Sequence, residues 1–236
     1  MRSNALASLV AACFLRLALD LFDQAHAKVF REAEIIGLVS VAKNDLKTIL
    51  APYVGKEFDV TAREQLKADF AKISMFTSVS FKLTHQDLLR LYVQERKPVA
   101  QTTFQKHWFI DPQGERFSWF GSQAPPIVPT IYGNWQTKSQ FQDSSSVFQV
   151  AVVLMEDIQS VLQMDPISLH WHTDLGWTVF LQEDLPDFYI GRADYRPKLQ
   201  RLAKIMPDIM SQKDKILRVD CNFHDRIVVK LLPIEE

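Results

Sequence analysis

Residues 78–100 read SVSFKLTHQDLLRLYVQERKPVA, and two runs within this stretch alternate between apolar and polar side chains. The apolar residues form one set for each run: Val79, Phe81 and Leu83, then Leu89, Leu91 and Val93. Alternation with a period of two predicts half-buried strands. The polar connector Thr84–Asp87 between the runs predicts that the two strands form a hairpin.

Two helices are expected before this hairpin. The first has an apolar stripe at helical spacing: Leu46, Ile49, Leu50 and Tyr53. We expect Ser40 to cap its start and Gly55 to end it. The second helix should open with a capping box at 61–64, in which Thr61 and Glu64 satisfy each other's free backbone donors. With a strand expected at 29–38, the order is strand, helix, helix, strand, strand.

This order is that of a POTRA domain, and short motifs make the resemblance more specific. The run Glu95-Arg96-Lys97-Pro98-Val99-Ala100 resembles the E-R-x-P-V-A signature that closes the POTRA domain of the FtsQ/DivIB cell-division family. The stretch 50–55 resembles that family's end of the first helix. The chain departs from the family at His85-Gln86, where a Trp-Pro pair is common, so the tip of the hairpin can differ in shape.

The second half reads as a mostly antiparallel β domain with two helices. Asp111–Gly114 predicts a turn between two strands, and 134–146 predicts a loop. Ser146 should cap a long helix, and Pro207 should end or kink the last one. The stretches 129–133 and Gly191-Arg192 are similar to family motifs, and the whole resemblance covers about residues 29–233.

We therefore expect an α+β fold in three parts. Residues 1–28 are a signal-anchor or weak transmembrane segment, 29–102 a POTRA domain, and 103–236 an FtsQ-type β domain.

The N-terminal segment, 1–28, has three possible interpretations. The apolar run 5–22 contains Arg16 and Asp20, which weaken it as an uncleaved anchor because buried charges resist insertion. Ala25-His26-Ala27 fits a signal-peptide cleavage pattern. An amphipathic helix opening a soluble protein is the third reading.

Composition excludes several classes of function. The chain has 236 residues with 27 basic and 28 acidic side chains, a net charge of −1, which lacks the basic excess of a nucleic-acid-binding protein. It has only 7 glycines and no glycine-rich loop to cradle a nucleotide phosphate. A disulfide between its two cysteines, Cys13 and Cys221, is not expected, because it would tie the apolar N-terminal run to the far domain, and neither cysteine has a second thiol nearby for a metal site. We expect no cofactor and no small-molecule substrate.

Three sets of residues are candidates for catalysis or metal binding. His170, His172 and Asp174 would place two imidazoles on one strand face, as metal ligands require. The serines 144–146 lack a nucleophile elbow, and Asp174, Glu183, Asp184 and Asp187 offer a carboxylate pair. None of these sets has a further partner at fixed spacing, so an exposed strand, a helix cap and a solvated hairpin explain them more simply.

Function is then expected from a surface. The last strand, 227–232, is apolar and close to the C-terminus, where a sheet edge is easily left open to an added strand. On that view, Val228→Pro should abolish partner capture by removing a backbone donor. The resemblance implies a divisome scaffold of the cell inner membrane, at the septum, that binds FtsB- and FtsL-like partners. Asp220 and Phe223 match the family's V-D-x-x-Y stretch, with phenylalanine in place of tyrosine.

The expected partner-binding residues lie in and after that stretch: Val219, Asp220, Phe223, Asp225, Ile227 and Val229. For the two apolar residues Phe223 and Val229, plain core packing is the alternative. Two other functions stay open. The chain can be a POTRA component of outer-membrane assembly or secretion, although too few residues follow for a barrel. It can also be an envelope enzyme of unknown substrate.

Overall fold

The computed structural model describes residues 29–84 and 87–233. The expectations for residues 1–28 and for the hairpin tip at 85–86 lie outside these ranges. The chain divides into two compact units, each containing helices and strands. Unit 1 comprises the described residues up to Glu95 together with Phe120–Gln123, and unit 2 comprises 96–119 and 124–233. The sequence-based boundary after residue 102 falls inside a strand, Ala100–Phe104.

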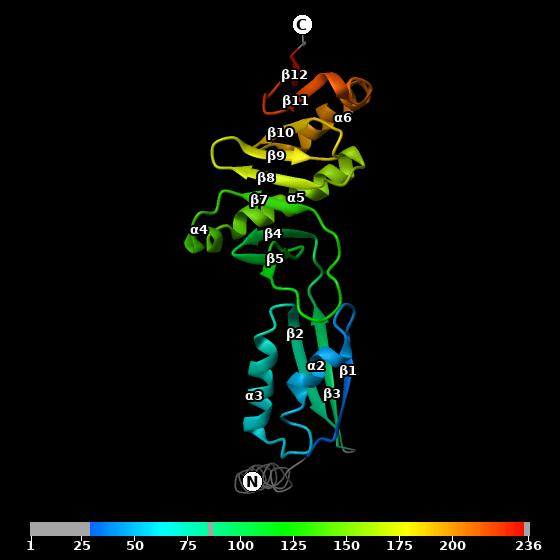
Figure 1. Cartoon of the computed structure of the whole chain (residues 1–236), viewed down its shortest axis with the longest axis vertical. Helices are drawn as coiled ribbons and strands as arrows, with labels where there is room; N and C mark the ends of the chain where they lie inside the picture. The colour runs from blue at the N-terminus through cyan, green and yellow to red at the C-terminus, as the bar shows by residue number, and fades with distance from the viewer. Residues whose placement is uncertain (1–28, 85–86, 234–236) are drawn as a thin grey trace, which may run out of the picture. The chain divides into compact units, whose positions relative to one another are not determined.

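Unit 1 has the predicted order of elements. These are β1 (Glu32–Ile36), α2 (Lys43–Leu50), α3 (Val60–Ala71), β2 (Phe76–Leu83) and β3 (Leu88–Glu95). The sheet has the order β1-β3-β2, with β1 parallel to β3 and β2 antiparallel to it. Both helices cover the same face of this sheet (Figure 1). The predicted hairpin is confirmed, since Val79 pairs with Val93 and Phe81 with Leu91.

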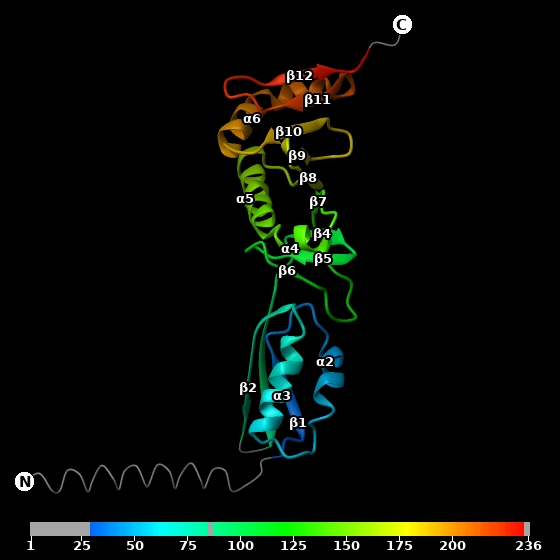
Figure 2. The same ribbon diagram turned by 90° about the vertical axis from the view of Figure 1, so that its left-hand side faces the viewer.

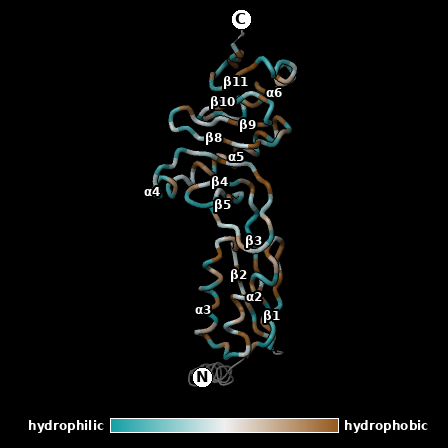
Figure 3. Tube along the Cα trace, in the orientation of Figure 1, coloured by the Kyte–Doolittle hydropathy of each residue, from teal (hydrophilic) through white to brown (hydrophobic). Residues whose placement is uncertain are grey.

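The core of unit 1 follows from the alternation seen in the sequence. Hydrophobic and hydrophilic residues alternate along β3 (Figure 3), and its inward residues Leu89 and Leu91 are fully buried. Leu46 of α2 and Leu66 of α3 are fully buried as well. The helical stripes and the strand faces therefore meet in one apolar layer.

Three predicted helix boundaries in unit 1 are wrong. Ser40 does not cap α2, because the N-cap position is Ala42; the backbone N–H of Ser40 donates instead to the carboxylate of Glu95. Thr61 does not cap α3, since the helix begins one residue earlier and Asp59 accepts from the N–H of Ala62 at 2.8 Å. Helix α2 ends at Leu50 with Ala51 as its C-cap, so Gly55 does not end it and Tyr53 lies beyond it.

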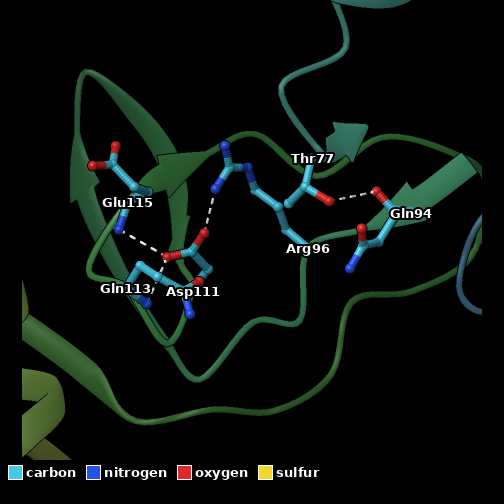
Figure 4. A network of polar contacts seen from close by, with 6 residues as sticks. All are labelled: Thr77, Gln94, Arg96, Asp111, Gln113 and Glu115. Atoms are coloured by element: carbon cyan, nitrogen blue, oxygen red, sulfur yellow. Dashed lines mark hydrogen bonds and ion pairs between the residues drawn. The ribbon is translucent and has the colours of Figure 1, made fainter. Parts of the chain in front are cut away.

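The E-R-x-P-V-A run places two adjacent side chains in different units. Glu95 accepts three backbone hydrogen bonds in unit 1, from the N–H groups of residues 39, 40 and 41 at 2.9, 2.7 and 3.1 Å. Arg96 forms an ion pair with Asp111 in unit 2. Asp111 also accepts from the N–H groups of Gln113 (3.0 Å) and Glu115 (2.9 Å), as Figure 4 shows. Glu95 thus binds the backbone of unit 1, whereas Arg96 binds Asp111, which holds a backbone turn of unit 2.

Unit 2 is a nine-stranded sheet of order β12-β11-β10-β9-β8-β7-β4-β5-β6. Most neighbours are antiparallel, and β10–β11, β4–β7 and β7–β8 are the parallel pairs. The strands are β4 (Ala100–Phe104), β5 (Lys106–Ile110), β6 (Arg116–Phe117), β7 (Thr130–Gly133), β8 (Ser168–His172), β9 (Gly176–Phe180), β10 (Asp187–Gly191), β11 (Ile216–Asp220) and β12 (Val228–Leu231).

Two long helices, α5 (Ser145–Leu162) and α6 (Tyr195–Ser211), lie on one face of this sheet (Figure 2). A short helix, α4 (Lys138–Gln142), interrupts the stretch predicted as a loop; Thr137 caps it, and Phe141 is buried. The long helix begins at Ser145, so Ser146 is not its cap. Pro207 does not end α6, which continues to Ser211. A 3-10 turn, Lys213–Lys215, leads into β11.

Of the described helices, α5 is the one long and apolar enough to cross a membrane. Its buried residues include Phe148, Leu154 and Ile158, which belong to the core of unit 2. Its apolar character is therefore accounted for by packing against the sheet.

Candidate partner-binding edge

The strand β12 lies at one end of the nine-stranded sheet. It pairs antiparallel with β11, with Val219 opposite Val229 and Asp220 opposite Val228. No other strand in the described part of the chain pairs with it. Its second side is therefore an open edge, and all four of its residues are exposed.

The direction of the backbone groups on β12 follows from one hydrogen bond. The N–H of Leu232 donates to the carbonyl of Lys215 at 2.8 Å, towards the β11 side. In an antiparallel ladder, alternate residues of a strand point their N–H and C=O groups to the same neighbour. The N–H groups of Val228 and Lys230 consequently face β11, whereas those of Val229 and Leu231 face the open edge.

The side chains of β12 make the edge apolar. Cross-strand partners lie on the same face of a sheet. Val229 is opposite the fully buried Val219, and Leu231 is opposite the buried Ile216, so both lie on the helix-covered face. They nevertheless remain 38% and 59% exposed, because the cover ends near β11. An added strand would bury them.

The loop before β12 is held by α6. The ammonium of Lys198, whose pKa is lowered by burial, donates to the carbonyl of Ile190 (2.8 Å) and to Oδ1 of Asn222 (3.2 Å). Arg201 Nη2 donates to the carbonyl of Phe223 at 3.0 Å. Gly191 has a φ of +85°, and a Cβ there would lie 2.0 Å from Asn222 Oδ1. The lack of a side chain at Gly191 thus leaves room for Asn222, which accepts the hydrogen bond that ties this loop to Lys198.

Three of the predicted partner-binding residues lie partly or fully inside the fold. Val219 is fully buried in the core of unit 2. Asp220 is half-buried, and its Oδ1 accepts from the backbone N–H of Asn222 at 2.9 Å. Ile227 is half-buried against the same core. These three residues support the edge by packing or hydrogen bonding inside unit 2 and are not fully accessible to a partner.

The other three are accessible. Phe223 is 39% exposed, with the guanidinium of Arg226 5.2 Å from its ring centroid. Asp225 is exposed in the loop, and Val229 lies on β12. Core packing alone therefore does not account for Phe223 and Val229, because both side chains leave apolar surface exposed to solvent.

Leu231 and Leu232 are further exposed apolar residues of this edge outside the predicted partner-binding set, and Val228, also exposed, is expected from the sequence only as a backbone donor. They belong to the apolar run that predicted the last strand, which is the signal that could have found them. The thiol of Cys221, just before the loop, is buried, and burial raises its pKa to about 12. This cysteine is part of the core.

The catalytic candidates sit in ordinary structural surroundings. The His170 ring lies between Tyr132 and Phe180, with centroids at 4.6 and 4.5 Å, and burial lowers its pKa. Within 29–84 and 87–233, no three His, Cys, Asp or Glu side chains cluster closely enough to hold a metal ion. Ser144 donates its hydroxyl to the carbonyl of Phe141 at 2.6 Å, next to the start of α5.

Comparison with known proteins agrees with this architecture. The family model described as cell division protein FtsQ/DivIB, C-terminal, matches residues 98–222. The cell division protein FtsQ of Geotalea daltonii is 23% identical over 90% of the chain and 75% of that protein. Those of Xanthomonas campestris pv. campestris and Geobacter sp. are 21% and 22% identical, over 80% and 84% of the chain and 65% and 74% of their own lengths.

The family match covers unit 2 from the residues before β4 to the loop after β11, more than half of the chain. It includes the Gly191-Arg192 motif and the α6 residues that hold this loop. The alignments with whole relatives extend the likeness into unit 1. The chain belongs to the FtsQ/DivIB family of cell-division proteins.

Proposed function

We propose that this chain is a non-enzymatic scaffold of the bacterial divisome that captures an FtsB-like partner by adding a strand of that partner to β12. The observation that carries the proposal is the open apolar edge of β12, where all four residues are exposed. A solvent-exposed apolar edge strand invites pairing and is normally blunted in proteins that remain alone.

The geometry of β12 favours a particular pattern of residues in the proposed partner strand. The backbone groups of Val229 and Leu231 point outward and can each bond to it. Its residues on the helix-covered face would lie beside the side chains of Val229 and Leu231 and should be apolar. On the opposite face, Val228 and Lys230 favour a mixed apolar and acidic pattern. The exposed Arg192 and Arg226 suit further acidic residues of the partner.

Membership of the FtsQ/DivIB family supports the choice of an FtsB-like partner, and we propose that an FtsL-like chain joins the same complex. We further propose that residues 1–28 hold the protein in the cell inner membrane as a single pass, with units 1 and 2 in the periplasm at the septum. In this arrangement unit 1 is the POTRA domain and unit 2 the β domain, and the protein links early to late steps of septum assembly.

Proline substitution tests strand addition, because proline lacks the N–H and is tolerated on an edge strand only where that N–H faces solvent. Leu231→Pro should leave the protein folded and weaken binding of an FtsB-derived strand peptide about tenfold or more. Leu231→Thr, which keeps the N–H, is the matched control for losing the side chain. Normal affinity in folded Leu231→Pro would rule out strand addition.

Val228→Pro is a second comparison. Its N–H faces β11, so this substitution should detach β12 itself and lower the stability of unit 2, unlike Leu231→Pro. The expectation that Val228 supplies the donor to a partner is therefore replaced by one that assigns this role to Val229 and Leu231. Equal stability of the two proline variants would contradict the assigned direction of the backbone groups.

The cellular role is tested by pull-down from membranes together with imaging of a tagged copy. We expect midcell localisation and recovery of division proteins with the wild-type chain. Diffuse envelope localisation without division proteins would refute the scaffold function. Leu231→Pro should still reach the membrane but lose the FtsB-like partner, which separates failure of the edge from failure of localisation.

A further inference from the structure

Unit 1 has an open strand edge of its own. The strand β1 pairs only with β3 and lies at the end of the three-stranded sheet. No strand among the described residues covers its other side. Since alternate N–H and C=O groups of an edge strand point outward, β1 presents backbone donors and acceptors that another chain can use.

A groove of about 550 Å³ runs beside this edge, between β1 and α2. Both elements are labelled in Figure 1. It is lined by Ala33 and Ile35 of β1 and by Lys43, Lys47, Leu50, Ala51 and Val54 of α2 and the following turn. Ala33 and Ile35 pair with Leu89 and Leu91, so they lie on the helix-covered face. Every second side chain of a strand added to β1 would therefore point into the groove.

A strand added to β1 would meet basic side chains of α2 on one of its faces and acidic side chains of β1 on the other. Lys43 and Lys47 stand one turn apart on α2, both exposed, and neither has an ion-pair partner in the part of the chain that the structure describes. The carboxylate of Asp45 on the same helix is taken by Ser122 and Ala42. The opposite face carries Glu32 and Glu34, and Glu34 pairs with Arg90 at 2.8 Å.

We propose that this groove binds an extended segment of a second protein by strand addition to β1. The residues of that segment that face α2 are apolar and acidic, to fill the groove and meet the two lysines. The residues between them are neutral or basic, because they lie on the face of Glu32 and Glu34. The site belongs to unit 1 and does not depend on the β12 edge.

Two peptides of identical composition test the proposal on the full chain. In Thr-Val-Lys-Asp-Lys-Val-Thr, the two valines and the aspartate share the face that would meet α2. In Thr-Val-Asp-Lys-Lys-Val-Thr, a lysine takes the place of that aspartate and the aspartate moves to the other face. We expect the first to bind about tenfold more tightly at low salt. Its amide shift changes should concentrate in 32–36 and in α2.

Charge reversal gives the matched variants. Lys43→Glu with Lys47→Glu should reverse the preference between the two peptides. Lys56→Glu with Lys67→Glu changes the net charge equally, at exposed positions outside the groove, and should leave the preference intact. Ala33→Trp should fill the groove and abolish binding of both peptides. Unchanged far-ultraviolet circular dichroism and a retained cooperative thermal transition would show that each variant is folded.

Several results would overturn the proposal. These are equal affinity for the two peptides, shift changes outside β1 and α2, or an unchanged preference in the Lys43 and Lys47 double variant. Concentration-dependent dimers that Ala33→Trp disperses would instead assign the groove to a second copy of the chain. Stronger peptide binding after removal of residues 1–28 would assign it to the chain's own N-terminal segment.

Discussion

Ser122 donates hydrogen bonds from its backbone N–H and its hydroxyl to Asp45 Oδ2, at 2.9 and 3.2 Å, although 77 positions separate the two residues. Beside it, Phe120 packs against Phe76 with ring centroids 6.4 Å apart. Gly121 has a φ of +111°, and a Cβ there would lie 2.8 Å from the same carboxylate oxygen. Unit 1 is thus completed by a segment that follows β6 in the sequence.

Replacing Ser122 should raise the pKa of Asp45. The N–H of Ser122 is the main cause that holds this pKa below its usual value of 3.8, and the hydroxyl and the N–H of Ala42 add to it. Ser122→Ala should therefore raise the pKa partway, and Ser122→Pro, which also lacks the N–H, should raise it further. A carbon-detected NMR titration measures both. The pKa of Asp69, lowered by Lys72 and Tyr53, is the internal control and should not move.

The same hydrogen bonds make stability depend on pH. A depressed carboxyl pKa stabilises the fold fully above the unfolded value of about 4, and the contribution disappears as pH falls through the native value. The difference in unfolding free energy between wild type and Ser122→Pro should accordingly shrink as the solution is acidified below that range. A difference that grew on acidification would show that Asp45 is not the group involved.

Removing the carboxylate of Glu95 should destabilise unit 1. Its two oxygens accept three backbone N–H groups from residues 39–41, and Glu95→Gln turns one acceptor into a donor. We expect a loss of about 1–3 kcal/mol, the usual cost of a lost charged hydrogen bond. Hydrogen exchange of the 39–41 amides should accelerate. Glu57→Gln, at an exposed position without such contacts, should leave both quantities unchanged.

Asp111 should contribute far more to the stability of the fold than an exposed carboxylate does. Its side chain is 1% exposed and accepts from Arg96 and from two backbone N–H groups. Asp111→Ala should cost about 3–5 kcal/mol, because it breaks a buried ion pair and leaves the backbone N–H groups of Gln113 and Glu115 without their acceptor. Glu34→Ala, which breaks the exposed pair with Arg90, should cost at most about 1 kcal/mol.

Tryptophan fluorescence can assign the effect of Asp111→Ala to one unit. All five tryptophans of the chain lie in unit 2: Trp108, Trp119, Trp135, Trp171 and Trp177. The fluorescence transition in urea should therefore move to lower denaturant in Asp111→Ala and stay in place in Glu34→Ala. Equal shifts in the two variants would contradict the burial argument.

Gly191→Ala should destabilise unit 2 and disturb the loop before β12. The added Cβ would lie 2.0 Å from Asn222 Oδ1, so the acceptor of Lys198 must move. We expect a loss of about 2 kcal/mol or more, combining positive-φ strain with the displaced hydrogen bond. Gly55→Ala is the control for strain alone, because Gly55 has a φ of +74° and no atom within 4 Å of its Cβ position. It should cost about 1 kcal/mol.

The strands of unit 1 were predictable because the alternation of Val79, Phe81 and Leu83 reports directly on burial. The helix starts were not, because several residues compete for each cap. Thr61 and Asp59 are both good caps by residue type, and in the structure the side chain of Asp59 takes this role. Ser40 lies two residues before the N-cap position of α2, Ala42, and its backbone N–H donates to Glu95, which lies 55 positions away in the sequence. A local pattern cannot report a contact at that distance.

For the candidate site, the sequence located the last strand but not its orientation. The direction of each N–H on β12 depends on the pairing of Leu232 with Lys215, which no pattern within the strand encodes. The burial of Val219 likewise depends on β10 and β12 flanking it on both sides. Alternation predicts the face of a residue, whereas access to a partner depends on the order of strands in the sheet.

The contribution of Phe120–Gln123 to unit 1 also bears on the order of events during synthesis. Domains generally fold as units as the chain emerges, the N-terminal one first. Here the first unit lacks the ring of Phe120 and the donors of Ser122 until the ribosome has passed residue 123. By then β4, β5 and β6 of the second unit have already been made. The nascent chain must therefore hold these three strands unfinished while its first unit closes.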